Sequence, residues 1–248
     1  MRRLLLLIAF FAAVAGCTAE LKEENNSLLR ALEVQEREIA AVVTENGELK
    51  LRLADLEAQQ KRADLAVSLG MRPGEDLWAL LETSRGEVLC ELLPASAPLT
   101  VANFVQLVEG KKPWQDQETK QMITGTPYYD GTLFHRVIPE FMIQGGDRSG
   151  TGRGTPGFLI PDEFDPKLKH LAGTISMANT GAPNSGGSQF FITDVAAPQL
   201  DGKYSAFGSC EPLSLIREIA RAPRDENDRP LESILLRRAT VHRGARPL

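Results

Sequence analysis

The chain has 248 residues, of which 42% are hydrophobic and 25% are charged, and both values are close to the averages for folded globular proteins. Its formal net charge of −5 gives no basic footprint for nucleic acid, so we expect no nucleic-acid partner. Three cysteines and three histidines occur without C-x-x-C or H-x-x-x-H spacing, so the sequence predicts no metal site, and we expect no cofactor.

Residues 1–16 have the pattern of a secretory signal peptide. Arg2 and Arg3 precede eleven apolar residues at 4–14, and small residues follow. A membrane-spanning helix needs about 20 apolar residues, so this segment is too short to be one.

The end of this segment, Val14-Ala15-Gly16-Cys17, resembles the lipobox of bacterial lipoproteins. The resemblance implies that Cys17 becomes the lipidated first residue of the mature protein and holds it in the bacterial cell envelope, facing the periplasm. Thr18 stands where an inner-membrane retention signal would often place Asp, which favours the outer membrane over the inner one. The alternative is a secreted protein that carries Cys17 by chance.

A long helix is predicted over residues 20–69, because this segment is rich in Leu, Glu, Ala, Lys and Arg and contains no proline. Ten of the fourteen positions of a heptad seam are apolar: the d positions are Leu21, Leu28, Gln35, Val42, Leu49, Leu56 and Ala63, and the a positions are Asn25, Leu32, Ile39, Asn46, Leu53, Gln60 and Val67. Asparagine at a favours a fixed register and few strands in parallel coiled coils. Residues 17–71, the lipidated Cys included, are therefore predicted to form a stalk through which copies of the chain associate. The alternatives are a single amphipathic helix lying on its own domain and a partly disordered tether.

Residues 72–248 have the size of one domain built from short strands and turns, after a helix break at Arg72-Pro73-Gly74. The alternation of Val88, Cys90 and Leu92 predicts one strand, closed by a proline.

Further elements are expected downstream. They are a helix at 99–108 with Thr100 as its amino-terminal cap, a surface loop at 111–127, a helix at 213–221 and a closing strand at 233–242.

The most informative run is Phe-His-Arg-Val-Ile-Pro-Glu-Phe-Met-Ile-Gln-Gly-Gly-Asp at residues 134–147, with Ser-Gln-Phe-Phe-Ile-Thr at 188–193. Together these runs resemble the catalytic face of cyclophilins, the peptidyl-prolyl cis-trans isomerases. The resemblance implies a mainly β fold, in which a closed eight-stranded antiparallel barrel is capped by two helices. It also implies proline-containing polypeptides as substrates.

The same resemblance implies the site residues. Arg136, Phe141 and Gln144 match the catalytic positions of the family. The substrate-binding positions are matched by Met142, Ala178, Asn179, Gln189, Phe191, Leu200 and Tyr204. A prolyl amide rotates over a barrier of about 18–20 kcal/mol. Its nitrogen becomes a better hydrogen-bond acceptor as the bond twists, so the permanently charged Arg136 is expected to bind the transition state better than either ground state.

Some positions depart from the family pattern or mimic another one. Gln199 stands where animal cyclophilins often carry Trp, so weak cyclosporin binding is expected, and Tyr204 replaces a pocket His without an expected loss of activity. His135 is expected to be structural, because isomerisation moves no proton. The pattern Gly152-x-Gly154-x-x-Gly157 matches a dinucleotide-binding motif but contains a proline and opens no helix, so we interpret it as a loop beside the substrate groove.

Cys90 and Cys210 both fall at strand positions that alternation would bury. Free buried thiols are the favoured interpretation, and a disulfide in an oxidising envelope is the alternative.

Three functions are compatible with these patterns. The favoured one is a prolyl isomerase that assists the folding of exported envelope proteins. The alternatives are a proline-binding chaperone with little turnover and a structural envelope lipoprotein whose coiled coil is the main functional element.

Overall fold

The computed structural model describes residues 19–72 and 74–247, so the predicted signal peptide and Cys17 lie outside the described residues. The chain divides into two compact units, Met1–Gln60 and Lys61–Leu248. None of the helices in the described ranges has both the length and the apolar character that crossing a membrane requires.

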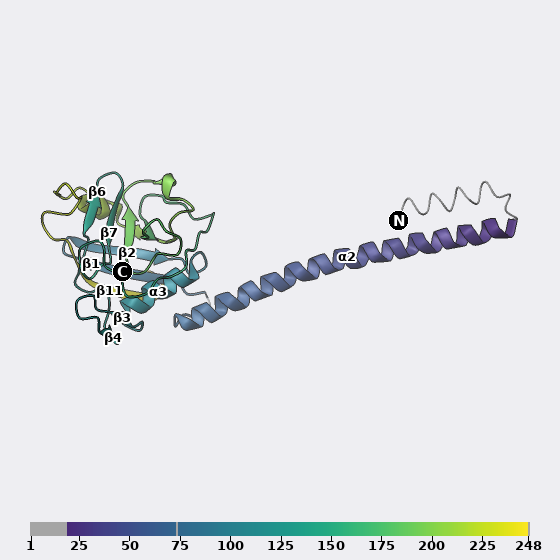
Figure 1. Ribbon diagram of the computed structural model, residues 1–248, viewed down its shortest axis with the longest axis horizontal. Helices are drawn as coiled ribbons and strands as arrows, with labels where there is room; N and C mark the ends of the chain where they lie inside the picture. Colours follow the sequence, from purple (N-terminus) through teal and green to yellow (C-terminus); the bar gives the residue numbers. More distant parts are fainter. Residues whose placement is uncertain (1–18, 73, 248) are drawn as a thin grey trace. The chain divides into compact units, whose positions relative to one another are not determined.

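The predicted long helix is present as α2 (Ala19–Ser68), a continuous helix of 50 residues (Figure 1). It ends before the predicted break, because Gly70 adopts a left-handed φ of 67°. The N–H of Gly70 donates to the carbonyl of Val67 and the N–H of Met71 donates to that of Ala66, the pattern of a Schellman cap. Just beyond the helix, Leu69 is only 2% exposed and joins the core of the second unit.

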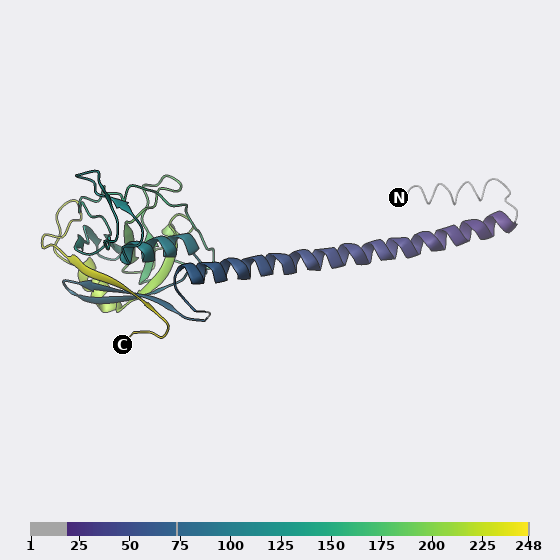
Figure 2. The same cartoon turned by 90° about the horizontal axis from the view of Figure 1, so that it is seen from below.

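Nine strands of the second unit form one curled antiparallel sheet (Figures 1 and 2). Their order in the sheet is β5 (Thr132–Leu133), β11 (Leu235–Arg243), β1 (Leu77–Thr83), β2 (Gly86–Leu92), β10 (Ala206–Glu211), β8 (Thr174–Met177), β9 (Phe190–Thr193), β7 (Met142–Gly145) and β6 (Arg136–Ile138). Figure 2 shows β11 in yellow beside blue strands, of which β1 pairs with β11 on one edge and with β2 on the other.

The expected number of eight strands differs from the nine observed. The two ends of the sheet order, β5 and β6, are separate short strands, although only Phe134 and His135 lie between them in sequence. The mainly β architecture is confirmed, whereas closure of the sheet into an eight-stranded barrel stays a prediction.

The core lies inside the curl of the sheet. Residues of β1 alternate between buried and partly exposed, as expected for a strand with one face on a core. At the centre, the ring of Phe104 packs against those of Tyr129, Phe207 and Phe190 at centroid distances of 5.0, 5.3 and 5.7 Å.

Two helices pack on the sheet, α3 (Pro98–Val108) and α4 (Leu213–Ala220), together with a short 3-10 turn, η1 (Pro198–Leu200). The predicted cap at Thr100 is wrong, because the helix begins at Pro98 and Thr100 already lies in its first turn. The first-turn N–H groups of Leu99 and Thr100 instead donate to the carboxylate of Glu163 at 3.0 and 2.8 Å.

The segment expected to be a surface loop at 111–127 contains a small hairpin of its own. Strands β3 (Trp114–Gln115) and β4 (Met122–Ile123) pair in it. Trp114 is only 4% exposed and packs edge-on against Tyr128, which anchors the hairpin to the domain.

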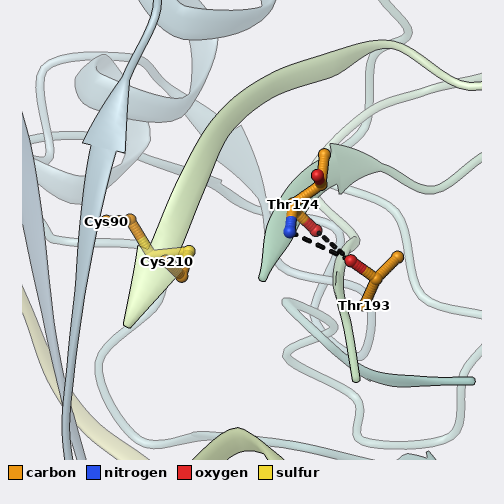
Figure 3. The surroundings of a disulfide bond; sticks show 4 residues. All are labelled: Cys90, Thr174, Thr193 and Cys210. Carbon is orange, nitrogen blue, oxygen red and sulfur yellow. Dashed lines mark hydrogen bonds between the residues drawn. A yellow bond between two sulfur atoms is a disulfide. The ribbon is translucent and has the colours of Figure 1, made fainter. Parts of the chain in front are cut away.

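Cys90 and Cys210 form a disulfide (Figure 3), so the favoured interpretation of free thiols is wrong. The register of β2 and β10 places the two residues directly opposite each other, with their Cα atoms 4.0 Å apart. Sequence alternation predicted that both side chains would be buried, but it carries no information on which strands are neighbours.

Candidate active site

Arg136 and Gln144 lie opposite each other in the hairpin formed by β6 and β7. The register pairs Arg136 with Gln144, and Ile138 with Met142. Cross-strand partners point to the same face of a sheet, so these four side chains share one face. The intervening Val137 is fully buried on the opposite face, in the core.

The turn between β6 and β7 carries Phe141 and is held by a buried carboxylate. Glu140 has a φ of 56°, and its N–H donates to Asp194 at 2.9 Å. The N–H of Asp194 in turn donates to the carbonyl of Phe141. Arg217 of α4 and Arg221, the residue just after this helix, form ion pairs with this fully buried carboxylate at 3.5 and 2.9 Å. Helix α4 therefore fixes the turn that presents Phe141.

Phe191 reaches the same face from β9, where it pairs with Gln144 of β7. It is 5% exposed. The imidazole of His170 stacks on its ring with an interplanar angle of 13°, and Tyr204 packs against it edge-on at 5.4 Å. Asp201 accepts hydrogen bonds from the backbone N–H and the ring of His170. These bonds lower the pKa of the Asp201 carboxyl. The Phe191 ring is thus fixed from two sides.

These elements enclose a cavity of about 190 Å³ that we call the ring pocket. Nine of the ten predicted catalytic and substrate-binding residues line it: Arg136, Phe141, Met142, Gln144, Ala178, Asn179, Phe191, Leu200 and Tyr204. Its apolar wall is a cluster separate from the main core, formed by Met142, Phe191, Ala197 and Leu200 with partly buried neighbours. The pocket therefore has an apolar wall with an arginine and a glutamine beside it.

The guanidinium of Arg136 is half-exposed, with 44% of its side chain accessible. Its Nε lies 3.4 Å from Oδ2 of Asp228, and Oδ1 of the same carboxylate accepts a hydrogen bond from Arg224 at 3.2 Å. Asp228 comes from the turn before β11, and its carbonyl accepts the N–H of Val137 at 2.8 Å. This turn thus places a carboxylate on the Nε side of Arg136.

Gln189, the tenth predicted residue, lies outside the ring pocket. It lines a neighbouring hollow of about 390 Å³, which shares Gln144, Ala178 and Asn179 with the ring pocket. Its Oε1 accepts a hydrogen bond from Gln144 at 2.9 Å, and its Nε2 donates to the carbonyls of Gly152 and Gly154. Gln189 therefore orients Gln144 and connects it to the glycine-rich loop.

The glycine-rich loop uses its own backbone N–H groups to hold Asp147. Gly152 and Gly154 donate to this buried carboxylate at 2.7 and 3.0 Å. Burial raises the pKa of Asp147, but these bonds and those from Ser149 outweigh it and leave the pKa lowered. A Cβ on Gly154 would lie 1.7 Å from Oδ1 of Asp147, so only glycine fits there. In a dinucleotide-binding loop such N–H groups would bind phosphate. Here the N–H groups of Gly152 and Gly154 bind the carboxylate of Asp147 instead.

His135 lies beneath this loop and is 7% exposed. Burial lowers the pKa of its imidazole. Neither ring nitrogen has a hydrogen-bond partner among the described residues. His135 is not among the residues that line the ring pocket. The described residues include no group of three or more His, Cys, Asp or Glu side chains arranged to bind a metal.

Several contributors to the site were missed at the level of sequence. Ala197 and Ile138 extend the apolar wall, His170 supports Phe191, and Asp228 contacts Arg136. Ile138 could have been found, because it lies two residues from Arg136 on the same strand. No local signal identifies Asp228, whose position depends on the irregular turn before β11.

Comparison with known proteins agrees with this arrangement. Residues 79–241 match the family model described as cyclophilin-type peptidyl-prolyl cis-trans isomerase. Peptidyl-prolyl cis-trans isomerase A of Mycobacterium tuberculosis is 42% identical over 167 residues, which cover 66% of this chain and 91% of that protein. Peptidyl-prolyl cis-trans isomerase B of Streptomyces anulatus is 43% identical over 172 residues, covering 67% of this chain and 97% of that protein.

Among solved structures, a cyclophilin-type isomerase of Cryptosporidium parvum is similar with a TM-score of 0.60 and 32% identity, covering 69% of this chain and 99% of that one. The same protein crystallised in the presence of the dipeptide Ala-Pro gives a TM-score of 0.58. Fold, family model and relatives agree on the class of enzyme, an isomerase of prolyl peptide bonds. The chain belongs to the cyclophilin-type peptidyl-prolyl cis-trans isomerase family.

Proposed function

We propose that the ring pocket catalyses prolyl isomerisation without a covalent step, by binding the twisted amide more tightly than either planar form. The barrier of about 18–20 kcal/mol arises from lost amide resonance, so an enzyme only has to stabilise the twisted bond. The observation that carries the proposal is a half-exposed guanidinium beside an apolar cavity of about 190 Å³.

Arg136 is the proposed donor to the amide nitrogen, whose lone pair localises as the bond twists. A charge-assisted hydrogen bond contributes about 1.5–3 kcal/mol, which corresponds to roughly ten- to hundredfold in rate. Arginine stays charged at any working pH and has a planar set of donors. With its Nε beside Asp228, the terminal nitrogens of Arg136 are the donors that we assign to the substrate.

The apolar wall is proposed to hold the proline ring while the preceding residue turns. Phe141, Met142, Phe191 and Leu200 form the contacts with the ring, and Gln144 donates to a substrate carbonyl. Fixing one side of the rotating bond in a partly desolvated site supplies the stabilisation that one hydrogen bond does not. The packing of His170 and Tyr204 around Phe191 favours such a preformed site.

A rate assay on a prolyl tetrapeptide tests the mechanism. Arg136→Ala should lower kcat/KM by about 10- to 100-fold, which is the contribution of one charge-assisted hydrogen bond. Arg85→Ala is the matched control, because Arg85 forms a surface ion pair with Glu232 and does not line the ring pocket. Peptide binding by the unmodified protein without turnover would instead identify a proline-binding chaperone, and equal activity of Arg136→Ala and the wild type would exclude the mechanism.

We further propose that the enzyme is an envelope lipoprotein that assists the folding of exported proteins. The lipobox-like sequence ending in Cys17 and the long helix support an anchored enzyme on a stalk. The disulfide between Cys90 and Cys210 adds an independent argument, because disulfides persist in oxidising compartments such as the periplasm.

Cell fractionation tests the anchor. The wild-type chain expressed in a bacterium should sediment with membranes and release a lipid-modified peptide containing Cys17, whereas Cys17→Ser should appear in the soluble fraction. A soluble wild-type protein without lipid would exclude the anchor and leave the isomerase activity untouched. An unchanged envelope proteome after deletion of the gene would argue against a general folding role.

A further inference from the structure

We propose that two copies of the chain form a parallel, in-register coiled coil through residues 25–57 of α2, so that one stalk carries two isomerase domains. The inference goes beyond the proposed catalytic function and does not depend on it. It rests on the exposed apolar seam of α2, on the spacing of two asparagines within that seam, and on the charges that flank it.

The apolar residues of the seam are exposed to solvent in the single chain. Between residues 25 and 57 their exposed fractions range from 41% to 61%, and they are Leu28, Leu32, Ile39, Val42, Leu49, Leu53 and Leu56. Comparable side chains in the catalytic domain are fully buried, such as Leu77 at 1% and Leu81 at 0%. Most helical stability in proteins comes from packing of an apolar face, so this seam requires a partner. Apolar residues repeated at a and d fit a second helix in a left-handed supercoil.

Two asparagines favour a second copy of this chain as that partner. Asn25 and Asn46 both occupy a positions, three heptads apart. In a parallel pair with aligned chains, each asparagine faces its own counterpart and the two amides can hydrogen-bond. A slip of one heptad would place Asn25 against Leu32 and would bury an unpaired amide. Asparagine at a also favours two strands over larger bundles.

The charges beside the seam select the same arrangement. In a parallel coiled coil, the g residue of one chain lies near the e residue of the next heptad in the partner. This rule pairs Glu45 with Lys50 of the second copy, and Arg52 with Glu57 of the second copy. All four side chains are exposed in the single chain. No g-to-e pairing between residues 31 and 57 sets like charges opposite each other.

An antiparallel pair fits less well. In that arrangement each a residue lies opposite a d residue of the partner, and the d positions of this segment are Leu28, Gln35, Val42, Leu49 and Leu56. Only Gln35 could bond an asparagine, so at least one asparagine of each chain would face an aliphatic side chain.

The dimer would present two ring pockets on one support. A client with two prolyl bonds could then bind both domains, and the second binding step becomes intramolecular once the first has occurred. Dimerisation therefore matters for long, proline-containing clients and not for a tetrapeptide substrate.

Disulfide trapping tests the proposal in the full chain carrying Cys17→Ser, in which Cys90 and Cys210 are already bonded to each other. Gln35→Cys puts a thiol at a d position, and Thr44→Cys puts one at the outward f position as the matched control. Mild oxidation should crosslink most of the Gln35→Cys chains and few of the Thr44→Cys chains. Light scattering on the unoxidised protein should give twice the mass of one chain.

Exchanging the charges of the Glu45–Lys50 pair gives a second test of the dimer. Lys50→Glu should raise the dissociation constant of the dimer by roughly tenfold, because both symmetry-related pairs become repulsive. Combining it with Glu45→Lys should restore most of the affinity, whereas Glu48→Lys at the outward c position should change it little.

The mass and crosslinking measurements test the dimer independently of the isomerase activity. A monomeric mass, a mass of three or more chains, or equal crosslinking at positions 35 and 44 would overturn it. Turnover of a prolyl tetrapeptide per chain should be the same for Lys50→Glu and the wild type. Loss of turnover in the wild type itself would overturn the proposed function and leave the dimer in place.

Discussion

Asp228 is the residue through which the turn before β11 acts on the ring pocket. Its carboxylate lies between Arg136 and Arg224, and both it and Arg136 are partly exposed, at 30% and 44% of their side chains. An ion pair this exposed contributes about 0–1 kcal/mol to stability. Its main effect is therefore to orient the guanidinium rather than to hold the fold together.

Asp228→Asn should lower kcat/KM by roughly fivefold, about 1 kcal/mol, with an unchanged melting temperature. The reason is that Arg136 would sample orientations that do not point its terminal nitrogens to the substrate. Kinetics on a prolyl tetrapeptide measure the effect, and Glu226→Gln in the same turn is the control. In an Arg136→Ala background the Asp228 substitution should have no further effect, and a fivefold loss there would assign it another role.

His135 should make the fold sensitive to acid. Burial lowers its pKa in the folded protein below the ordinary value of 6.5, so the unfolded chain takes up a proton first as the pH falls. The contribution of neutral, buried His135 to the free energy of unfolding is therefore fully present above pH 6.5 and is lost as the pH falls below 6.5. Urea unfolding at pH 8 and pH 5.5 should show a smaller pH-dependent loss for His135→Gln than for the wild type. The same loss in both proteins would contradict this explanation.

At the scale of single elements, helix α3 depends on a side chain that is remote in sequence to cap its amino-terminal end. Helix α3 starts at Pro98 without a side-chain cap of its own, and Glu163 supplies both oxygens to its first turn. Glu163 is itself fixed by the hydroxyl of Ser205, which accepts its backbone N–H at 2.8 Å. A carboxylate at this end also favours the helix dipole.

Glu163→Gln should therefore lower the free energy of unfolding by about 1–2 kcal/mol, as loss of a charged amino-terminal cap does. Urea denaturation followed by circular dichroism measures it. The exposed Glu87 of β2 offers a control, because Glu87→Gln removes a charge without removing a cap. Equal midpoints for the two variants would show that Glu163 does not cap α3.

The helices and the ring pocket differ in how far sequence could predict them. Helix α2 was predicted within a few residues, because its composition and heptad pattern are local signals. Phe141, Met142 and Gln144 lie in one run, and their common face follows from the spacing on β7. The cap on Thr100 and the carboxylate beside Arg136 could not be predicted, because they come from Glu163 and Asp228, whose positions depend on irregular loops.

At the scale of the whole molecule, the disulfide between Cys90 and Cys210 closes a loop of 120 residues (Figure 3). Its formation depends on β2 and β10 being neighbours, which no local pattern reveals. The two strands lie in the middle of the sheet order, so the bond joins segments that are far apart in the unfolded chain.

Replacing both residues with Ala should lower the free energy of unfolding by about 2–5 kcal/mol, mainly because the unfolded chain gains conformational freedom. Guanidinium unfolding of the double variant and of the oxidised and reduced wild type measures the effect. Identical stability of the oxidised and reduced wild type would show that the bond contributes nothing.

The separation of the ring pocket's apolar wall from the main core has a consequence for evolution. Met142, Phe191, Ala197 and Leu200 pack together without belonging to the cluster around Phe104. Because this cluster is separate from the main core, we expect substitutions in it to change which polypeptides the proposed pocket accepts while the packing around Phe104 is retained. We therefore expect the specificity of related chains to diverge at a few wall positions, with the residues of the main core retained.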